Sequence, residues 1–164
     1  MKKIFDYMLP SDKSSLSTDI GLLLIRVGFA SFMLFGHGLG KLTGYAEKSA
    51  SFPDPLGIGS PASMALVVFA EFFASVAILF GFLTRLAVVP LIITMAVAGL
   101  IIHSADPFNI KELAVLYLLP FVALFFTGPG RFSLDYIISS AICKCGASNN
   151  VENIGEIQSE TAGS

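Results

Sequence analysis

Two histidines, two carboxylates and two basic residues lie in or beside long apolar stretches of this sequence, where ionisable groups are costly. Histidine and carboxyl groups carry protons in enzymes, and basic side chains hold anionic or electron-rich groups. These residue types therefore predict proton transfer, or the binding of a polar group, in an apolar environment. The residues are Arg26, His37, Lys41, Glu71, His103 and Glu112.

Arg26, His37 and Lys41 belong to a single apolar stretch, and a helix brings all three onto one face. A helix turns about 100° per residue, so positions 26, 30, 33, 37 and 41 share a side. A charge at the centre of a membrane helix costs about 2.5 to 3.5 kcal/mol and usually faces a partner inside the bundle. The rest of the chain is expected to supply those partners.

The composition is that of a membrane protein. Of the 164 residues, 54% are hydrophobic and 13% are charged, whereas soluble domains carry about 25% charged residues. The net charge of -2, the pI near 5.6 and the lack of a recognition motif exclude a nucleic-acid footprint. Mean hydropathy is +0.78, which fits a chain that lies largely in lipid.

Four apolar stretches are long enough to cross a bilayer, which takes about 20 helical residues. We place them at residues 20–42, 62–83, 86–103 and 110–127. The predicted fold is all-α, a polytopic membrane protein with an antiparallel four-helix bundle at residues 20–130. Asp6 and Pro10 interrupt the N-terminal segment 1–19 before any apolar run, so no cleavable signal is expected.

Helix ends are marked by local signals. Ser60 followed by Pro61 predicts a capped start of the second helix, and the four residues from Asn109 to Glu112 are close to a capping box. A carboxylate in a first turn stabilises the helix end whatever else it does, which gives Glu112 a purely structural interpretation. The tripeptide at residues 128–130, Gly-Pro-Gly, is a strong stop for the fourth helix.

The connection at residues 43–61 is rich in glycine and proline but also contains Phe52 and Leu56. It is long for a bundle connection. Two interpretations stay open: a floppy loop, or a lid tucked over the mouth of the bundle.

The C-terminal part is expected to hold a short interfacial helix at 131–145 and a disordered tail at 146–164. Lysine and arginine are more numerous on the side that both termini share, so the termini are expected to be cytoplasmic. Cys143 and Cys145 have neither the redox spacing nor a zinc pattern, and an incidental thiol pair is favoured over a redox or palmitoylation role.

An up-and-down arrangement brings His37, Lys41, His103 and Glu112 to one outer mouth. Glu71 lies about 14 Å below the start of its helix, near the midplane of a core about 30 Å thick. Arg26 is its expected partner there. No group with metal-ligand spacing is predicted.

Each of these side chains also has a structural interpretation. Glu71 can fix helix register as a neutral carboxyl or as an ion pair with Arg26, and Arg26 can extend to the interface as an anchor. His37 lies among glycines that favour close helix packing. The other two open alternatives are a polar-loop role for His103 beside Asp106, and headgroup contacts for Lys41 and Lys111. Two histidines at one depth are also the pattern of axial b-type haem ligands, an interpretation with no other support in the sequence.

Several short motifs occur in an order that resembles the DoxX family. They are Leu-Leu-Ile-Arg26-Val-Gly, Phe35-Gly-His-Gly-Leu-Gly-Lys41-Leu, Glu71, Gly81-Phe-Leu-Thr-Arg85, His103, Glu112 and Gly128-Pro-Gly-Arg-Phe-Ser-Leu-Asp135. The resemblance spans roughly residues 20–135. It implies a small four-helix protein of a bacterial or archaeal cytoplasmic membrane, related to the DoxD subunit of a thiosulfate:quinone oxidoreductase.

The leading hypothesis is a redox-associated subunit that binds a quinone or a similar lipophilic molecule in the bundle. His37, His103 and Glu112 are the candidate proton donors and relay, and Arg26, Glu71 and Lys41 are the candidate binding residues. Electrons would come from a redox partner protein, and homo-oligomers are left open. The alternatives are a non-enzymatic scaffold and a small-solute or proton pathway; Arg26 alone in the cytoplasmic half argues against the pathway.

Overall fold

The structure is a computed structural model that describes residues 15–142. Four of its helices are long and apolar enough to cross a membrane: Leu16–Thr43, Ser60–Phe80, Thr84–Ile102 and Phe108–Thr127. A short helix follows at residues 134–142. The all-α fold with four candidate spans is therefore confirmed. The N-terminal residues 1–14, the tail 146–164 and the pair Cys143 and Cys145 lie outside the described residues.

Each of the first three long helices contains one π-helical segment. The first joins α2, η1 and α3, the second α5, η3 and α6, and the third α7 and η4, while the fourth, α8, is α-helical throughout. The bounds are α2 Leu16–Met33, η1 Leu34–Gly38, α3 Leu39–Thr43, α5 Ser60–Val68, η3 Phe69–Ala74, α6 Ser75–Phe80, α7 Thr84–Val97, η4 Ala98–Ile102 and α8 Phe108–Thr127. Such segments are rare and occur frequently at functional sites.

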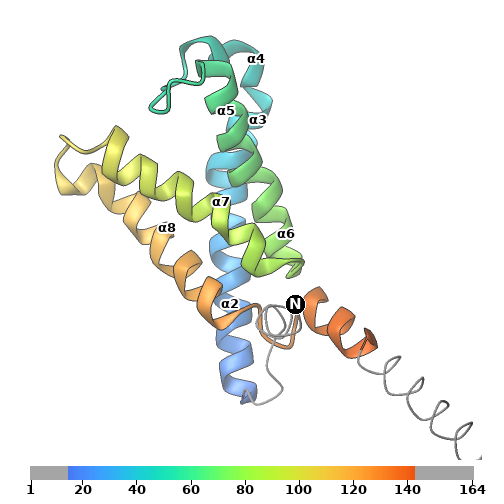
Figure 1. Ribbon diagram of the computed structural model, residues 1–164. Helices are drawn as coiled ribbons and strands as arrows, with labels where there is room; N and C mark the ends of the chain where they lie inside the picture. Colours follow the sequence, from blue (N-terminus) through green and yellow to red (C-terminus); the bar gives the residue numbers. More distant parts are fainter. Residues whose placement is uncertain (1–14, 143–164) are drawn as a thin grey trace, which may run out of the picture.

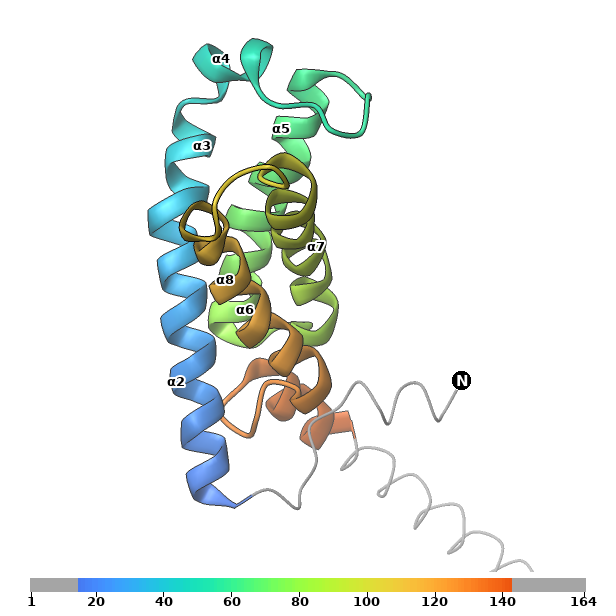
Figure 2. The same ribbon diagram turned by 90° about the vertical axis from the view of Figure 1, so that its left-hand side faces the viewer.

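The first two long helices stand side by side, and α7 and α8 form a hairpin that crosses them at an angle (Figures 1 and 2). Contacts join α7 to α8, α2 to α6, and α7 to η3. The core lies where these elements meet, and its fully buried side chains include Met33, Ile78, Leu91, Phe121 and Leu124. One end of the molecule carries α4 (Tyr45–Lys48), η2 (Ser49–Ser51) and the following loop; the opposite end carries the α6–α7 turn.

The α6–α7 turn is tight, as expected. Gly81 has φ 69° and Leu83 has φ 46°, so the chain reverses through left-handed backbone. The Asp135 carboxylate accepts hydrogen bonds from the amides of Leu83 at 2.7 Å and Thr84 at 2.9 Å. A distant carboxylate therefore caps α7.

Two predicted helix starts need correction. The first residue of α8 is Phe108, after Pro107, and no side chain caps it, so Asn109 is inside the helix and the capping-box prediction is wrong. Ser60 is likewise helical, with Gly59 before it at φ 99°. Pro61 does lie in the first turn of α5, as predicted.

Candidate functional site

A cavity of about 340 Å³ lies between the second and third long helices, below the loop that joins the first two. The volume is within the range of small-molecule sites, about 300 to 1,000 Å³. Most of its wall is apolar. Its lining includes Lys41, Phe52, Leu56, Ser63, Leu66, Glu71, Ile93, Ile102 and His103.

Lys41 and Glu71 form an ion pair in the cavity wall. Lys41 Nζ lies 2.5 Å from Glu71 Oε2, and the exposed fractions of the two side chains are 28% and 4%. Two ions removed from water need each other, because either one alone in a low-dielectric site carries a large desolvation cost. Arg26 was the expected partner of Glu71, and Lys41 was also given a headgroup role; the structure corrects both by pairing Lys41 with Glu71.

Gly38 sets the approach of the two helices that carry this pair. It lies at the end of η1, one turn before Lys41, and packs on the backbone of Glu71 in η3. A Cβ placed on Gly38 would lie 2.4 Å from the Glu71 carbonyl oxygen. Only glycine permits this backbone contact, which brings Lys41 within reach of the carboxylate.

Residues 52–56 form a lid over the cavity, because Phe52, Pro53, Pro55 and Leu56 all line it. Asp54 anchors this lid. Its carboxylate accepts hydrogen bonds from the Gly59 amide and the Ser63 hydroxyl, both at 2.7 Å, and from the Ile58 amide at 3.1 Å. The Ser63 hydroxyl, followed by the backbone amides, lowers the pKa of Asp54. Of the two interpretations left open for this connection, the structure favours the lid.

His103 lies at the cavity where the third long helix ends. Its Nδ1 is 2.7 Å from Asp106 Oδ2, and both side chains are partly exposed. A carboxylate on one ring nitrogen orients the imidazole and leaves the other nitrogen for a ligand or water. The polar-loop contact with Asp106 is therefore present together with a place in the cavity wall.

His37 and Glu112 lie elsewhere. The His37 ring packs edge-on against Tyr117 with the centroids 5.5 Å apart. Glu112 is exposed at the start of α8. Within the described part of the chain, the cavity thus brings together Lys41 and His103 but not His37 or Glu112, and the chemical roles of all four stay predictions.

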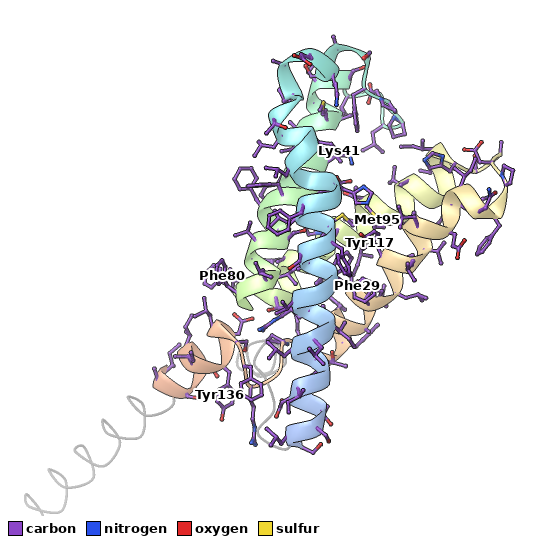
Figure 3. The ribbon with its side chains drawn as sticks, turned by 180° about the vertical axis from the view of Figure 1, so that it is seen from behind. Phe29, Lys41, Phe80, Met95, Tyr117 and Tyr136 are labelled. Atoms are coloured by element: carbon purple, nitrogen blue, oxygen red, sulfur yellow. The ribbon has the colours of Figure 1, made fainter. Side chains whose placement is uncertain are left out.

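Tyr117 is a residue whose role the sequence did not single out. It belongs to α8, is 8% exposed and has its ring beside Phe29 of α2 (Figure 3). The His37 ring also packs edge-on against it. A tyrosine in an otherwise apolar helix was the available signal. Its ring joins α8 to α2 and η1 through these two contacts.

The sequence model of the DoxX family matches residues 21–104. The chain belongs to the DoxX family. It is 31% identical over 126 residues to the inner membrane protein YqjF of Escherichia coli strain K12, an alignment that covers 74% of this chain and 94% of YqjF. A Haemophilus influenzae relative described as uncharacterized is 28% identical over 131 residues, which cover 75% of this chain and 86% of the relative. No solved structure matches the chain at a significant level.

The DoxX match ends at residue 104, before the segment 128–135 that also resembles the family. In the structure this segment surrounds Arg26, which is 2% exposed. The guanidinium donates to the carbonyl of Pro129 at 3.3 Å and to that of Phe132 at 2.5 Å. Arg26 is thus neither the partner of Glu71 nor an anchor that extends to the interface.

The Arg26 cluster, defined as Arg26 with Gly81, Pro129, Phe132 and Ser133, closes the end of the bundle opposite the lid. A Cβ on Gly81 would meet both the guanidinium and the Ser133 side chain, so the turn packs directly on Arg26. Nearby, Asp19 Oδ1 accepts a hydrogen bond from the Arg131 amide at 3.1 Å. Described residues 15–142 contain no group of three or more histidine, cysteine or acidic side chains able to hold a metal.

Proposed function

We propose that this DoxX-family protein is a multi-pass protein of the cytoplasmic membrane that binds a quinone, or a molecule of similar chemistry, in the cavity. The observation that carries the proposal is the Lys41–Glu71 ion pair in the wall of an otherwise largely apolar cavity. Such sites bind amphipathic ligands through apolar contacts and a few placed polar groups. The similarity to YqjF, an inner membrane protein, supports the membrane assignment.

The polar groups suit a ring that carries oxygen atoms. A lysine ammonium has three donor hydrogens, and the contact with Glu71 uses one, so Lys41 can also donate to a ligand carbonyl. The bond to Lys41 uses Oε2 of Glu71, which leaves Oε1 to accept from a ligand hydroxyl. His103 adds a proton-active group near the lid.

Reduction of a quinone takes two electrons and two protons and yields a quinol. Glu71 and His103 are the cavity residues able to pass protons, with Asp106 holding the His103 ring. The electrons would come from a redox partner protein, so the chain acts as the quinone-binding subunit of a pair. His37, beside Tyr117, is a candidate relay between the ion pair and the other face of the bundle.

The test is quinone binding to the purified protein in lipid nanodiscs. Glu71→Gln keeps the size of the side chain but removes the charge, and we expect it to weaken binding by about tenfold, equivalent to about 1.4 kcal/mol. Glu47→Gln, a change to an exposed carboxylate on α4, is the matched control. Unchanged affinity in Glu71→Gln, with normal thermal stability, would refute the site.

The same measurement separates binding from a scaffold role. A scaffold predicts that Glu71→Gln lowers yield and stability, and that any redox phenotype then follows the amount of protein. The quinone-binding function predicts a loss of affinity per folded molecule.

A further inference from the structure

The cavity opens at a rim that is formed by apolar side chains. Four large apolar lining residues are also widely exposed, namely Leu56 at 58%, Leu66 at 54%, Ile93 at 56% and Ile102 at 40%. A residue that lines a cavity and is this exposed lies at its rim. Within the helices the rim is therefore formed by α5 on one side and by α7 with η4 on the other, and Leu56 of the lid belongs to it at the loop end.

The helical part of this rim lies within the candidate membrane spans. Leu66 belongs to the span Ser60–Phe80, and Ile93 and Ile102 belong to the span Thr84–Ile102. The α7 helix packs on η3 and α6, and beyond η3 the α5 and α7 ribbons diverge (Figure 1). The opening between them thus faces the hydrocarbon of the bilayer rather than water.

The opposite approach, from the loop side, is covered by the lid. Phe52, Pro53, Pro55 and Leu56 lie across the cavity, and the three hydrogen bonds of Asp54 fix the lid to the start of α5. A ligand arriving from water would have to displace these residues. A ligand arriving from lipid meets mostly apolar side chains at the helical rim.

The volume limits what the cavity can enclose. About 340 Å³ is at the small end of ligand sites and holds a single-ring headgroup, but not a long hydrocarbon tail as well. An amphiphile whose head reaches Lys41 and Glu71 must therefore extend its tail through the rim.

We infer that the ligand enters sideways from the bilayer through a portal between Leu66 and Ile93, and that its single apolar tail occupies this portal in the bound state. The inference rests on the proposed function. It commits the site to a membrane-dissolved molecule with one small polar ring and one tail.

The experiment uses the fact that the chain contains no tryptophan. Phe52→Trp places a sole fluorophore in the cavity wall, where a bound quinone quenches it. Phe126→Trp, at a residue of α8 that is 65% exposed, reports collisional quenching by quinone in the lipid. The probes are a benzoquinone with a ten-carbon tail and the same ring without a tail, both added to nanodiscs.

The portal is narrowed by the pair Leu66→Phe and Ile93→Phe in the Phe52→Trp background. Leu116→Phe and Leu119→Phe, at exposed positions of α8 away from the cavity, form the matched control. We expect the narrowed portal to slow association of the tailed quinone by at least about tenfold, and that of the tailless ring by less, because a smaller molecule passes a narrower opening. A widened pair, Leu66→Ala and Ile93→Ala, should not slow either probe.

Slowing by the control pair as large as that by the narrowed portal would overturn the lateral route. So would an unchanged rate for the tailed quinone. If neither probe quenches Phe52→Trp beyond the Phe126→Trp level, the proposed function fails instead. If quinone quenches Phe52→Trp at the normal rate but its affinity does not change in Glu71→Gln, the proposed function is contradicted. The entry route is then judged from the association rates.

Discussion

The two ends of this bundle bury charge in different ways. Arg26 gives its hydrogen bonds to main-chain carbonyls of residues 129 and 132, which lie more than a hundred positions away in sequence. Lys41 instead donates its hydrogen bond to the Glu71 carboxylate, in the wall of a cavity. A charge fixed by backbone holds elements together, whereas a pair of side chains beside a cavity can share its hydrogen bonds with a ligand.

This difference separates structural from functional intramembrane charges. Carbonyl oxygens in the Arg26 cluster cannot move without unfolding the segment that carries them. A lysine side chain can rotate toward a ligand while keeping one hydrogen bond to its carboxylate. On this criterion Arg26 belongs to the fold, and Lys41 and Glu71 belong to the site.

The largest expected effect follows from replacing Arg26. Arg26→Met removes the donor to the carbonyls of Pro129 and Phe132 and disrupts packing on the α6–α7 turn, so we expect a loss of stability of about 3 to 5 kcal/mol, as for other broken buried charge interactions. Arg26→Lys should not restore it, because an ammonium cannot reproduce the planar fork of donors. Thermal unfolding in detergent measures both variants, with Lys48→Met on exposed α4 as the control.

If Arg26→Met proved as stable as the control, the distinction between the two ends would be lost. A loss of quinone affinity in the remaining folded Arg26→Met protein would also contradict it. The cluster lies at the end of the bundle opposite the cavity, so the affinity per folded molecule should stay the same.

The next effect comes from the helix contact below the ion pair. Gly38→Ala places a Cβ 2.4 Å from the Glu71 carbonyl oxygen. A Cβ on Gly36 or on Gly40 would have no atom within 4 Å. We expect Gly38→Ala to cost about 1 to 3 kcal/mol, the usual price of overpacking, and to weaken quinone binding. Gly40→Ala should be neutral or slightly stabilising, because alanine is the better helix former. Urea unfolding and quinone titration of the two variants provide the comparison.

A smaller effect on stability, but a clear one on binding, is expected at the ion pair itself. Lys41→Met leaves the Glu71 carboxylate without its partner and should be less stable than the double variant Lys41→Met with Glu71→Met, in which no charge remains buried. Both should lose quinone affinity. A double-mutant cycle read by thermal unfolding tests this order; a double variant less stable than Lys41→Met would show that the pair chiefly supports the fold.

Much of the fold follows from local pattern. Stretches of about 20 apolar residues predicted four spans, and Gly81 and Leu83 lie where the spacing required a tight turn. The start of α7 was less accurate, because Asp135 caps it with hydrogen bonds to amides more than fifty positions away in the chain. Such long-range hydrogen bonds leave no local signal.

The sequence predicted which residues contribute to the site, but not which of them contact each other. Spacing along one helix placed Arg26, His37 and Lys41 on a common stripe, yet their partners depend on how far each helix turns. The π segments add a residue to the turn at Leu34–Gly38 and Phe69–Ala74, and this shifts the faces that an ideal helix would present. Glu71 therefore pairs with Lys41, while His37 packs against Tyr117.

The smallest effect concerns the lid and its pH dependence. Hydrogen bonds from Ser63 and from the backbone lower the pKa of Asp54 below its ordinary value of 3.8. Since the folded-state pKa is depressed, the anchor contributes stability fully above pH 4 and loses it as the pH falls through the lowered pKa. Hydrogen exchange of the Ile58 and Gly59 amides should therefore accelerate below pH 4, after correction for the intrinsic rate. Asp54→Asn should remove this change, and quinone entry through the portal should be nearly unaffected by either, because that route does not pass the lid.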